Sequence, residues 1–368
     1  MFKNVDKWIG SYFAGQIKRV FAPDRFDGLT HVMFCVCDHY EPQWKGATKE
    51  EQQARVMRWV NEYPALAKKF KDADGFHPKH SFFYPGECYD KSHLDLLENI
   101  YKQNLGEVEI HLHHDNDTEE TLREQLLKAK EDFARHGFLG KRKLSPDRRF
   151  AFIHGNWSLN NSRPDGKWCG VNDESRILSE TGCYADFTFP SAPSATQPEK
   201  INSIYYASSC ATKPKAHNKG VDVSVRKFGD HHLMMVTGPL TLNWKRRSKG
   251  IFPKIENGDM TGVNPPTPDR VDLWIEQRIA VKGKPDWIFV KTHTHGAQEG
   301  NMDVLLGEPM AAMHTYLRDR YNDGKKYCLH YVSAREMYNI IKAAQAGESG
   351  NPNDYRDYII EKANCGQN

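Results

Sequence analysis

Long apolar stretches are absent from this 368-residue sequence. No segment approaches the roughly 20 consecutive apolar residues that an α-helix needs to span a bilayer. The N-terminus also lacks the apolar core and the small-residue cleavage site of a secretory signal peptide. We therefore predict a cytoplasmic protein with no integral membrane segment.

Paired cysteines and a strong charge bias are also absent. The eight cysteines show no CxxC spacing, and Cys35 and Cys37 alternate within an apolar run, which indicates mostly buried free thiols in a reducing compartment. The formal net charge of +3 gives no reason to expect a nucleic acid partner, and the basic run 245–247 is typical of a solvated loop. The sequence contains no internal repeat and no low-complexity segment.

What the sequence does contain is an alternation of strand and helix patterns. Apolar runs end in polar clusters and are followed by amphipathic segments with apolar residues at helical spacing. Such units favour a parallel sheet, so the expected fold is α/β, a distorted (β/α) barrel with an insertion at about 201–270. The main strands are expected at 29–42, 80–90, 107–113, 148–159, 286–298 and 326–334.

The chain is expected to have three parts. Residues 1–28 form an N-terminal helical extension, residues 29–345 the barrel, and residues 346–368 a polar and loosely held C-terminal tail. Segment 7–21 mixes aromatic and basic residues, so a helix lying on a membrane surface is an alternative to an ordinary packing helix.

The stretch 107–117, EVEIHLHHDND, carries the densest cluster of metal-binding side chains. It alternates as a strand and is followed at once by a helix, which places the cluster at the carboxyl end of a strand. Imidazole and carboxylate groups suit zinc and similar divalent ions, and His113 and Asp117 are four residues apart across the turn. Asp117 could instead cap the helix. His111 and His114 are expected to support the site or to lie at the surface.

Four expected strands end in side chains that can carry chemistry. In a parallel barrel these ends meet at one face, where active sites are built from residues distant in sequence. The four groups are Asp38-His39, His113 to Asp117, His154-Gly155-Asn156-Trp157 and His293-Thr294-His295.

The order and local sequences of these motifs resemble those of the polysaccharide deacetylase family, the NodB-like carbohydrate esterases built on a distorted (β/α) barrel. The resemblance rests on the segments VCDHYEP, EIHLHHDND and FVKTHTHG. The segments HGNWSL and CYADFTFPSA are similar in placement to two further motifs of the family. The resemblance covers residues 29–345 apart from most of 201–270. The arginine of the family's third motif has no counterpart near Gly155, where Asn156 stands instead.

The resemblance and the side-chain chemistry together imply roles for individual residues. A divalent metal, with zinc the favoured ion, is expected on Asp38, His39, His113 and Asp117. Asp38 is also the expected catalytic base, and His293 or His295 the acid that protonates the leaving group. The expected substrate-binding residues are Asn156, Trp157, Tyr184 and Asp186, with core packing as the alternative for the aromatic ones.

The predicted function is metal-dependent removal of an acetyl group from an N-acetylated, or less favourably an O-acetylated, saccharide in polysaccharide metabolism. One alternative is a barrel glycosidase that uses paired carboxylates, for which Asp38, Glu87 and Asp186 are candidates. The other alternative is a saccharide-binding protein on a barrel that has lost catalysis, which the missing arginine motivates. The sequence leaves the identity of the sugar and the oligomeric state open.

Overall fold

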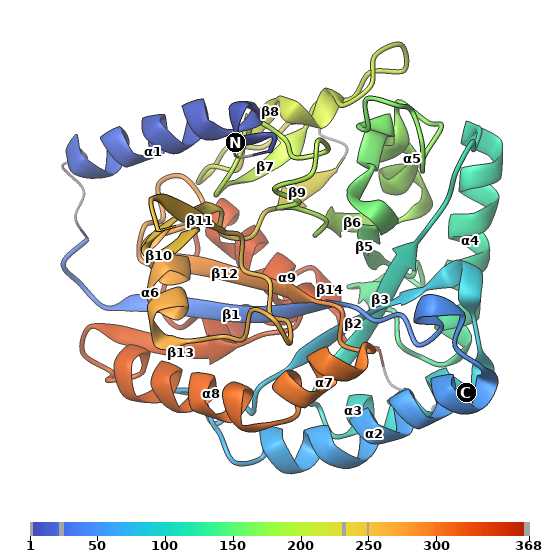
Figure 1. Ribbon diagram of the computed structural model, residues 1–368, viewed down its shortest axis with the longest axis horizontal. Helices are drawn as coiled ribbons and strands as arrows, with labels where there is room; N and C mark the ends of the chain where they lie inside the picture. Colours follow the sequence, from blue (N-terminus) through green and yellow to red (C-terminus); the bar gives the residue numbers. More distant parts are fainter. Residues whose placement is uncertain (1–2, 22–25, 230–232, 249, 364–368) are drawn as a thin grey trace.

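The computed structural model describes residues 3–21, 26–229, 233–248 and 250–363, and its centre is a largely parallel sheet (Figure 1). The neighbouring strands follow the order β12-β1-β2-β3-β5-β6-β9-β7-β8, and β13 pairs with the first half of β1. Among the described residues of this sheet, the pairs β7–β9 and β7–β8 are antiparallel and the other pairs are parallel. The strands are β1 (Thr30–His39), β2 (His80–Pro85), β3 (Gly106–Leu112), β5 (Phe150–His154), β6 (Cys183–Asp186), β7 (Ile204–Ala207), β8 (Gly220–Asp222), β9 (Met234–Val236), β12 (Trp287–Thr294) and β13 (Tyr327–Tyr331).

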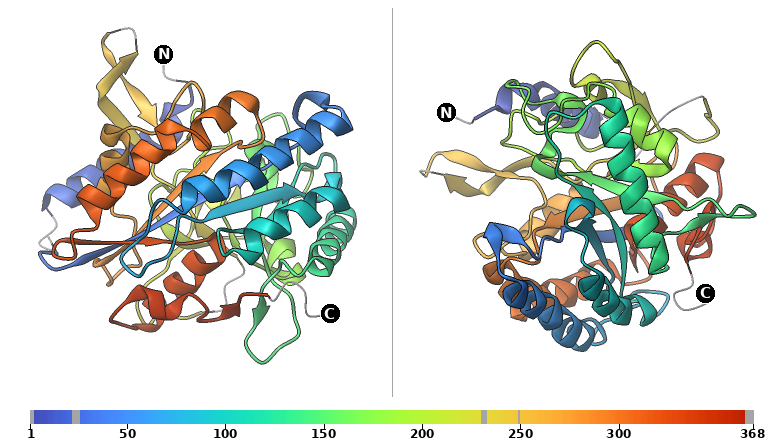
Figure 2. Two further views of the ribbon diagram at one scale, coloured as in Figure 1. Left: turned by 90° about the horizontal axis from the view of Figure 1, so that it is seen from below. Right: turned by 90° about the vertical axis from the view of Figure 1, so that its right-hand side faces the viewer.

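Helices cover both faces of this sheet. Helices α2, α3 and α8 lie side by side over one face, while α9 packs on the other (Figure 2). The helices are α1 (Ile9–Phe21), α2 (Lys49–Ala67), α3 (Lys91–Lys102), α4 (Glu119–Arg135), α5 (Glu174–Thr181), α6 (Pro268–Glu276), α7 (Glu299–Leu305), α8 (Glu308–Tyr321) and α9 (Ala334–Ala346). The predicted α/β class with a parallel, barrel-like sheet is confirmed at this level.

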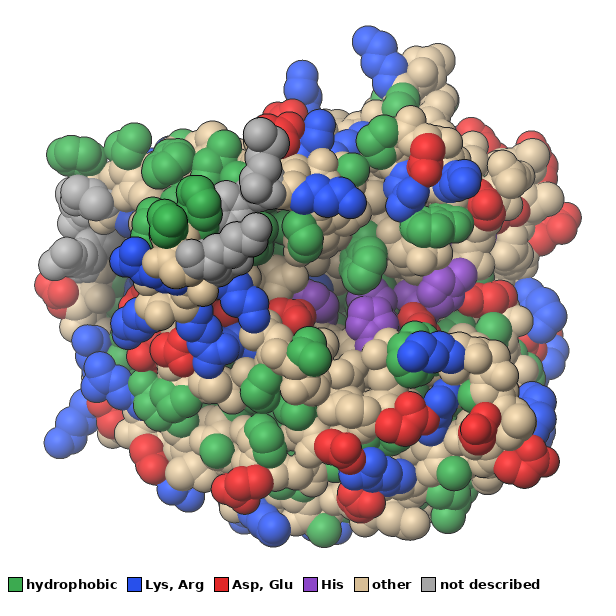
Figure 3. Space-filling view, in the orientation of Figure 1, with side chains coloured by type: hydrophobic (Ala, Val, Ile, Leu, Met, Phe, Trp, Pro, Cys, Tyr) green, Lys and Arg blue, Asp and Glu red, His purple; other side chains and the backbone are tan. Residues whose placement is uncertain are grey.

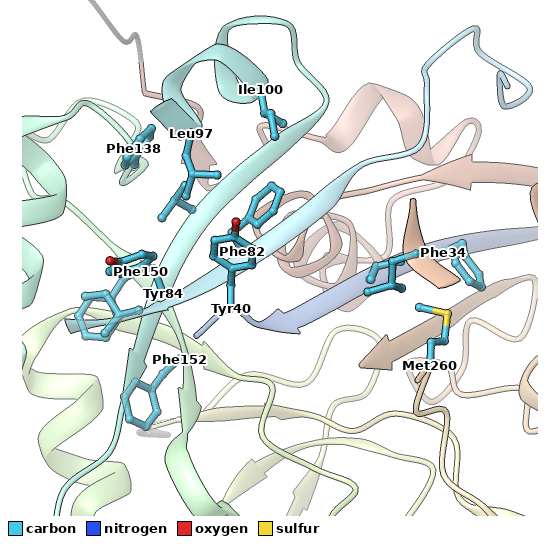
Figure 4. Close-up of a cluster of buried hydrophobic side chains, with 14 of the residues drawn as sticks. Phe34, Tyr40, Phe82, Tyr84, Leu97, Ile100, Phe138, Phe150, Phe152 and Met260 are labelled. Carbon is cyan, nitrogen blue, oxygen red and sulfur yellow. The ribbon is translucent and has the colours of Figure 1, made fainter. Parts of the chain in front are cut away.

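Strand β1 divides two hydrophobic cores. Its even-numbered residues, such as Phe34, belong to the core under the helices that also contains Phe82 of β2 and Leu97 of α3 (Figure 4). Its odd-numbered residues, Met33 and Cys35, pack in a second core on the opposite face. Because side chains alternate along a strand, this parity also decides which polar residue at the end of β1 faces which side.

The region 201–270 differs from the expected insertion. Strands β7, β8 and β9 from this region join the central sheet, so part of it belongs to the main fold. Strands β10 (Thr241–Ser248) and β11 (Phe252–Glu256) form the separate antiparallel hairpin, which projects from the body (Figure 2). Short strands are hard to recognise in sequence because each offers only a few alternating residues.

The C-terminal segment up to residue 363 is packed, contrary to the loosely held tail that we expected. Strand β14 (Ile360–Glu361) pairs with β4 (Lys141–Arg142), and the Asn339 side chain donates to the carbonyl of Ile360 at 2.7 Å. The rest of the expected tail, 364–368, lies outside the described residues.

The structure also bears on the membrane and cysteine predictions. None of the helices in the described residues is long and apolar enough to cross a membrane. The seven cysteines in the described ranges are free thiols, and four of them are buried, as the sequence indicated for most of them. Cys365 lies outside those ranges.

Candidate active site

The carboxyl ends of β1, β3 and β12 bring together five metal-binding side chains, which we call the groove cluster: His39, Glu41, His111, His113 and His295. Glu41 Oε1 lies 3.1 Å from His111 Nε2 and 3.4 Å from His113 Nε2, and the rings of His39 and His295 stack at 4.6 Å between centroids. Two triads share Glu41, one with His39 and His295 and one with His111 and His113. Within each triad all ligand atoms lie within 4.8 Å of one another.

The groove cluster follows from strand alternation. His39 is odd-numbered and therefore points to the same face of β1 as Met33 and Cys35, away from the helix-side core. His111 and His113 are two residues apart, on and just beyond β3, and so point to one side together. Figure 3 shows histidine side chains gathered in a hollow across the middle of one face of the molecule. The cluster is therefore open to a ligand: His113 has 31% of its side chain exposed, and His295 is also only partly buried.

The hydrogen bonds orient these rings for metal binding. His111 Nδ1 lies 2.8 Å from the carbonyl oxygen of Ile153, and a carbonyl can only accept, so this nitrogen carries the proton. The lone pair of a neutral His111 is then on Nε2 and faces the Glu41 carboxylate. His39 Nε2 is buried with no hydrogen-bond partner among the described residues. A cation between these groups would satisfy them, and a backbone carbonyl that fixes the ligand tautomer is usual at metal sites.

Electrostatics divides the cluster into neutral and charged groups. Burial lowers the pKa of His39 and of His295, so both imidazoles are neutral, the form that binds a metal. Burial would raise the pKa of Glu41, but the neighbouring imidazoles of His111 and His113 outweigh it and hold that pKa well below its usual range. For His113, burial is outweighed by Glu41 and Glu87, which raise its pKa to about 10.

Asp38 lies outside the groove cluster, contrary to the expectation that it binds the metal and acts as the base. It is even-numbered on β1, so its carboxylate points into the helix-side core and is fully buried. Oδ2 lies 2.8 Å from His80 Nε2, and Oδ1 accepts a hydrogen bond of 2.5 Å from the backbone N–H of Gly296. Asp38 therefore holds the end of β12, and with it His295, in place.

We expect Gly296→Ala to disturb this support. A Cβ at position 296 would lie 2.0 Å from Asp38 Oδ2 and 2.8 Å from a ring carbon of Trp59, and such overpacking typically costs about 1–3 kcal/mol. The displacement should also weaken any ligand bound at His295. The matched control is Gly300→Ala, because an added Cβ there meets nothing within 4 Å. Equal thermal midpoints for the two variants would contradict the role given to Asp38.

Asp117 is likewise separated from His113. Its Oδ2 lies 2.9 Å from Nδ1 of His114, and it also accepts hydrogen bonds from the side chains of Thr121 and Gln125. The N-cap of α4 is Thr118 rather than Asp117. The expected pairing of His113 with Asp117 on one ion is therefore wrong in placement, because adjacent residues at the end of β3 point to opposite sides.

The predicted residues Trp157 and His293 do lie beside the groove cluster. The Trp157 ring centroid is 6.1 Å from those of both His39 and His295. Together with His293 and the segment 190–194, Trp157 lines a cavity of about 270 Å³, near the small end of the range for ligand pockets. Asn156 precedes Trp157, and both have left-handed backbones, with φ of 57° and 56°. Such strain in non-glycine residues is often found at functional sites.

Tyr184 and Asp186 are not placed in the groove. Tyr184 is buried on β6, its hydroxyl donates to the carboxylate of Glu109, and its ring lies 4.8 Å from that of Tyr338 at an interplanar angle of 40°. Asp186 is 1% exposed and accepts hydrogen bonds from the backbone N–H and the hydroxyl of Thr188. Both side chains belong to the interior of the fold and do not line the groove.

The pH dependence of stability should report on Asp186. Burial raises its pKa to about 7 even though Thr188 lowers it, whereas an unfolded aspartate titrates near about 3.9. Its stabilising contribution is complete below that lower value and is lost as the pH rises through about 7. Asp186→Asn should therefore gain stability relative to wild type between pH 5 and pH 8, by about 1 kcal/mol or more. Denaturant titrations at both pH values test this, and an unchanged difference would contradict it.

Sequence reasoning gave no role to Glu41 and considered Glu87 only as a carboxylate of the glycosidase alternative. Glu41 lies two positions after His39 and so continues the inward parity of β1, a signal that the strand pattern contained. Glu87, just beyond β2, lies 2.7 Å from His113 Nδ1. No local pattern links Glu87 to His113, because the pair forms only when β2 and β3 align.

Comparison with known proteins adds little to this geometry. No protein-family model and no curated protein matches the chain, so the resemblance to polysaccharide deacetylases gains no support there. Among solved structures, the chain is similar to a GH57 branching enzyme from the hyperthermophilic archaeon Thermococcus kodakaraensis, in complex with glucose and additives. The identity is 9% and the TM-score 0.38, with 82% of this chain and 70% of that chain covered. At this level of similarity we assign the chain to no family.

Proposed function

We propose that the groove cluster binds a divalent metal ion, zinc by preference, and that the protein is a metal-dependent hydrolase. The observation that carries this proposal is the orientation of His111, whose Nδ1 donates to the carbonyl of Ile153, so that its other ring nitrogen, Nε2, faces Glu41 at 3.1 Å. His39, Glu41, His111 and His295 would hold the ion, a set of nitrogen and oxygen ligands that suits zinc. Such an ion supplies an activated water and polarises an acyl carbonyl.

The remaining side chains of the groove position and exchange protons. Glu87 lies 2.7 Å from Nδ1 of His113 and so fixes that ring, as a carboxylate orients histidine in other hydrolytic sites. The opposite nitrogen of His113 faces the cluster and can give a proton to the departing group. Asp38 anchors the backbone just after His295, through Gly296, and takes no part in proton transfer.

The substrate class that we propose is an acetylated saccharide. The cavity beside His293 and His295 is of about 270 Å³, and Trp157 at its wall offers an aromatic face of the kind that packs on apolar ligand surfaces. In the reaction, the bond between the acetyl carbon and the amine or alcohol breaks. The water oxygen joins the acetyl carbon, and the leaving group takes a proton. The motif resemblance favours an N-acetyl group over an O-acetyl group.

Metal content and acetate release together test this function. The purified protein should contain a transition metal, and a panel of N- and O-acetylated oligosaccharides should yield acetate that a chelator abolishes and zinc restores. A protein that binds no metal at the groove after reconstitution would overturn the proposal. Saccharide binding without acetate release would instead favour the non-catalytic alternative.

A second candidate function is cleavage of a glycosidic bond by paired carboxylates. The favouring observation is that Glu41 and Glu87 lie on the two sides of the His113 ring at the groove. Of the three carboxylates named for this function from the sequence, Glu87 lies at the groove, whereas Asp38 and Asp186 fit less well because they are buried and hydrogen-bonded. Glycoside cleavage by this pair needs no metal, so release of reducing ends that resists a chelator would identify it.

A further inference from the structure

A second set of metal-binding side chains lies behind the groove, in the interior. Nitrogen, sulfur and oxygen atoms from His114, His154, Cys169 and Glu174 all lie within 4.8 Å of one another, and all four side chains are buried. They come from the end of β3, the end of β5, the loop 155–173 and the start of α5. We propose that these four residues form a closed structural zinc site, independent of the groove cluster.

The contacts around Glu174 resemble a coordination shell without its ion. Glu174 Oε1 lies 3.2 Å from His114 Nε2, and Oε2 lies 3.5 Å from His154 Nε2 and 3.4 Å from Cys169 Sγ. The Nε2 atom of His154 is fully buried and has no hydrogen-bond partner within the described ranges. An ion at the centre of these atoms would satisfy all four donors at once.

The surroundings of the sulfur offer hydrogen bonds to a thiolate, although burial and the Glu174 carboxylate raise the pKa of the Cys169 thiol. The backbone N–H groups of Asn161 and Val171 point at Cys169 Sγ, at 3.3 and 3.4 Å. Hydrogen bonds of this kind stabilise negative charge on sulfur. A thiolate beside the buried Glu174 carboxylate would be strongly disfavoured without a cation. Zinc binding supplies that cation and displaces the thiol proton to solvent.

Both histidines are supported from behind. Nδ1 of His114 lies 2.9 Å from Asp117 Oδ2, and Nδ1 of His154 lies against the carbonyl oxygen of Gly155 and 3.3 Å from the backbone nitrogen of Ser158. A carboxylate or carbonyl on the second ring nitrogen is the usual partner of a zinc-bound histidine. Four protein ligands with no open position mark a structural site, whereas catalytic zinc sites keep a position for water.

The site would pin an irregular loop that borders the groove. The connection 155–173 has no α-helix or strand, exceeds the roughly 12–15 residues above which such loops are uncommon, and has left-handed backbones at Asn160, Asn161 and Trp168. Its far end is tied to the segment after β3, where Asp117 N donates to the carbonyl of Cys169 at 3.0 Å. The near end carries Trp157. A zinc ion here would therefore hold one wall of the groove.

Cobalt substitution of the full-length protein tests the proposal. The wild-type protein loaded with Co²⁺ should show a thiolate-to-cobalt charge-transfer band in the near ultraviolet, which the groove cluster cannot produce because it contains no sulfur. Cys169→Ser should abolish the band and lower the zinc content by one equivalent. Cys183→Ser, which removes another buried thiol, should change neither. A wild-type protein that shows no such band after cobalt loading would overturn the proposal.

Two further measurements separate this site from the groove and from a folding defect. His111→Ala should retain the cobalt band even if it loses the groove metal, so the two proposals fail independently. Hydrogen exchange of wild-type protein covers the case in which Cys169→Ser does not fold. Removal of the metal should speed amide exchange in 155–173 at least tenfold, and zinc should reverse it. Unchanged exchange in this loop would count against a zinc ion that pins it.

Discussion

Replacement of His111 by alanine is expected to remove the groove metal and to lower hydrolytic turnover at least about a hundredfold. His111 is the ligand whose tautomer is fixed by Ile153 and whose Nε2 faces Glu41, so its loss leaves both the ion and that carboxylate without a partner. Metal ions contribute several kcal/mol to transition-state stabilisation, and about 1.4 kcal/mol corresponds to a tenfold change in rate. Elemental analysis and acetate release, measured on the same preparation, test both parts of the expectation.

The matched control for this experiment is His77→Ala. His77 is also a histidine that bonds a backbone carbonyl through Nδ1, that of Phe70, but it lies on the loop after α2, away from the groove. This variant should keep the metal and the activity. If His111→Ala retains both while its thermal midpoint matches that of the control, His111 is not a ligand and the groove does not work as proposed.

Local sequence patterns were sufficient for the elements and for the general position of the site. The alternation of β1, β3 and β12 and the polar groups after them placed His39, His113, His293 and His295 at one end of a parallel sheet, where the structure has them. This worked because strand periodicity and the βα order are local signals. The strand ends of a parallel sheet then meet without further information.

Which residues face the groove was harder to predict from the sequence than where the site lies. Asp38 and His39 are neighbours, and choosing between them required knowing which face of β1 is the inner one, which depends on the helices that pack over Val32 and Phe34. At the end of β3, Asp117 pairs with His114 and not with the predicted His113, again because neighbouring residues face opposite sides. A shift by one residue exchanges the two faces of a strand. A residue assigned to the wrong face is therefore placed on the opposite side of the sheet from its true position.

Contacts between segments distant in the chain could not be predicted from the sequence. The buried cluster around Glu174 joins β3, β5, the loop 155–173 and α5, and nothing in the spacing of Cys169 and Glu174 resembles a known zinc motif. Likewise, the four residues of β6 gave no sign that Tyr184 and Asp186 face the interior. These positions depend on the packed arrangement of the whole fold, which single-sequence patterns do not contain.

The same kind of long-range contact holds the C-terminal helix on the sheet. Arg335 of α9 and Glu107 of β3 are 2% and 3% exposed and form a bidentate pair, with Nε to Oε2 at 3.0 Å and Nη2 to Oε1 at 2.9 Å. Arg335 Nη1 also donates to the carbonyl of Ile360 at 2.7 Å, which ties down the C-terminal segment. The pair therefore links three separate parts of the chain in the interior.

Arg335→Met is expected to destabilise the protein by about 3–5 kcal/mol, because it leaves the Glu107 carboxylate buried without a cation. Equilibrium denaturation measures this change in the free energy of unfolding. The double variant Arg335→Met/Glu107→Gln removes the stranded charge and should be more stable than Arg335→Met alone, since a buried pair is costly to break but less costly to replace.

A surface pair gives the control for this double-mutant cycle. Arg58 of α2 forms exposed contacts with Glu62, one turn away at 3.2 Å, and with Asp303 at 2.9 Å, and exposed pairs typically contribute about 0.2–1 kcal/mol each. Arg58→Met should therefore cost far less than Arg335→Met, although both remove one arginine charge. If the two variants cost the same, or if the double variant is the least stable of the series, the interior pair stabilises the fold through packing of its side chains and not through its charges. In that case the attachment of the C-terminal segment would depend on the carbonyl contact with Ile360 and the apolar face of α9.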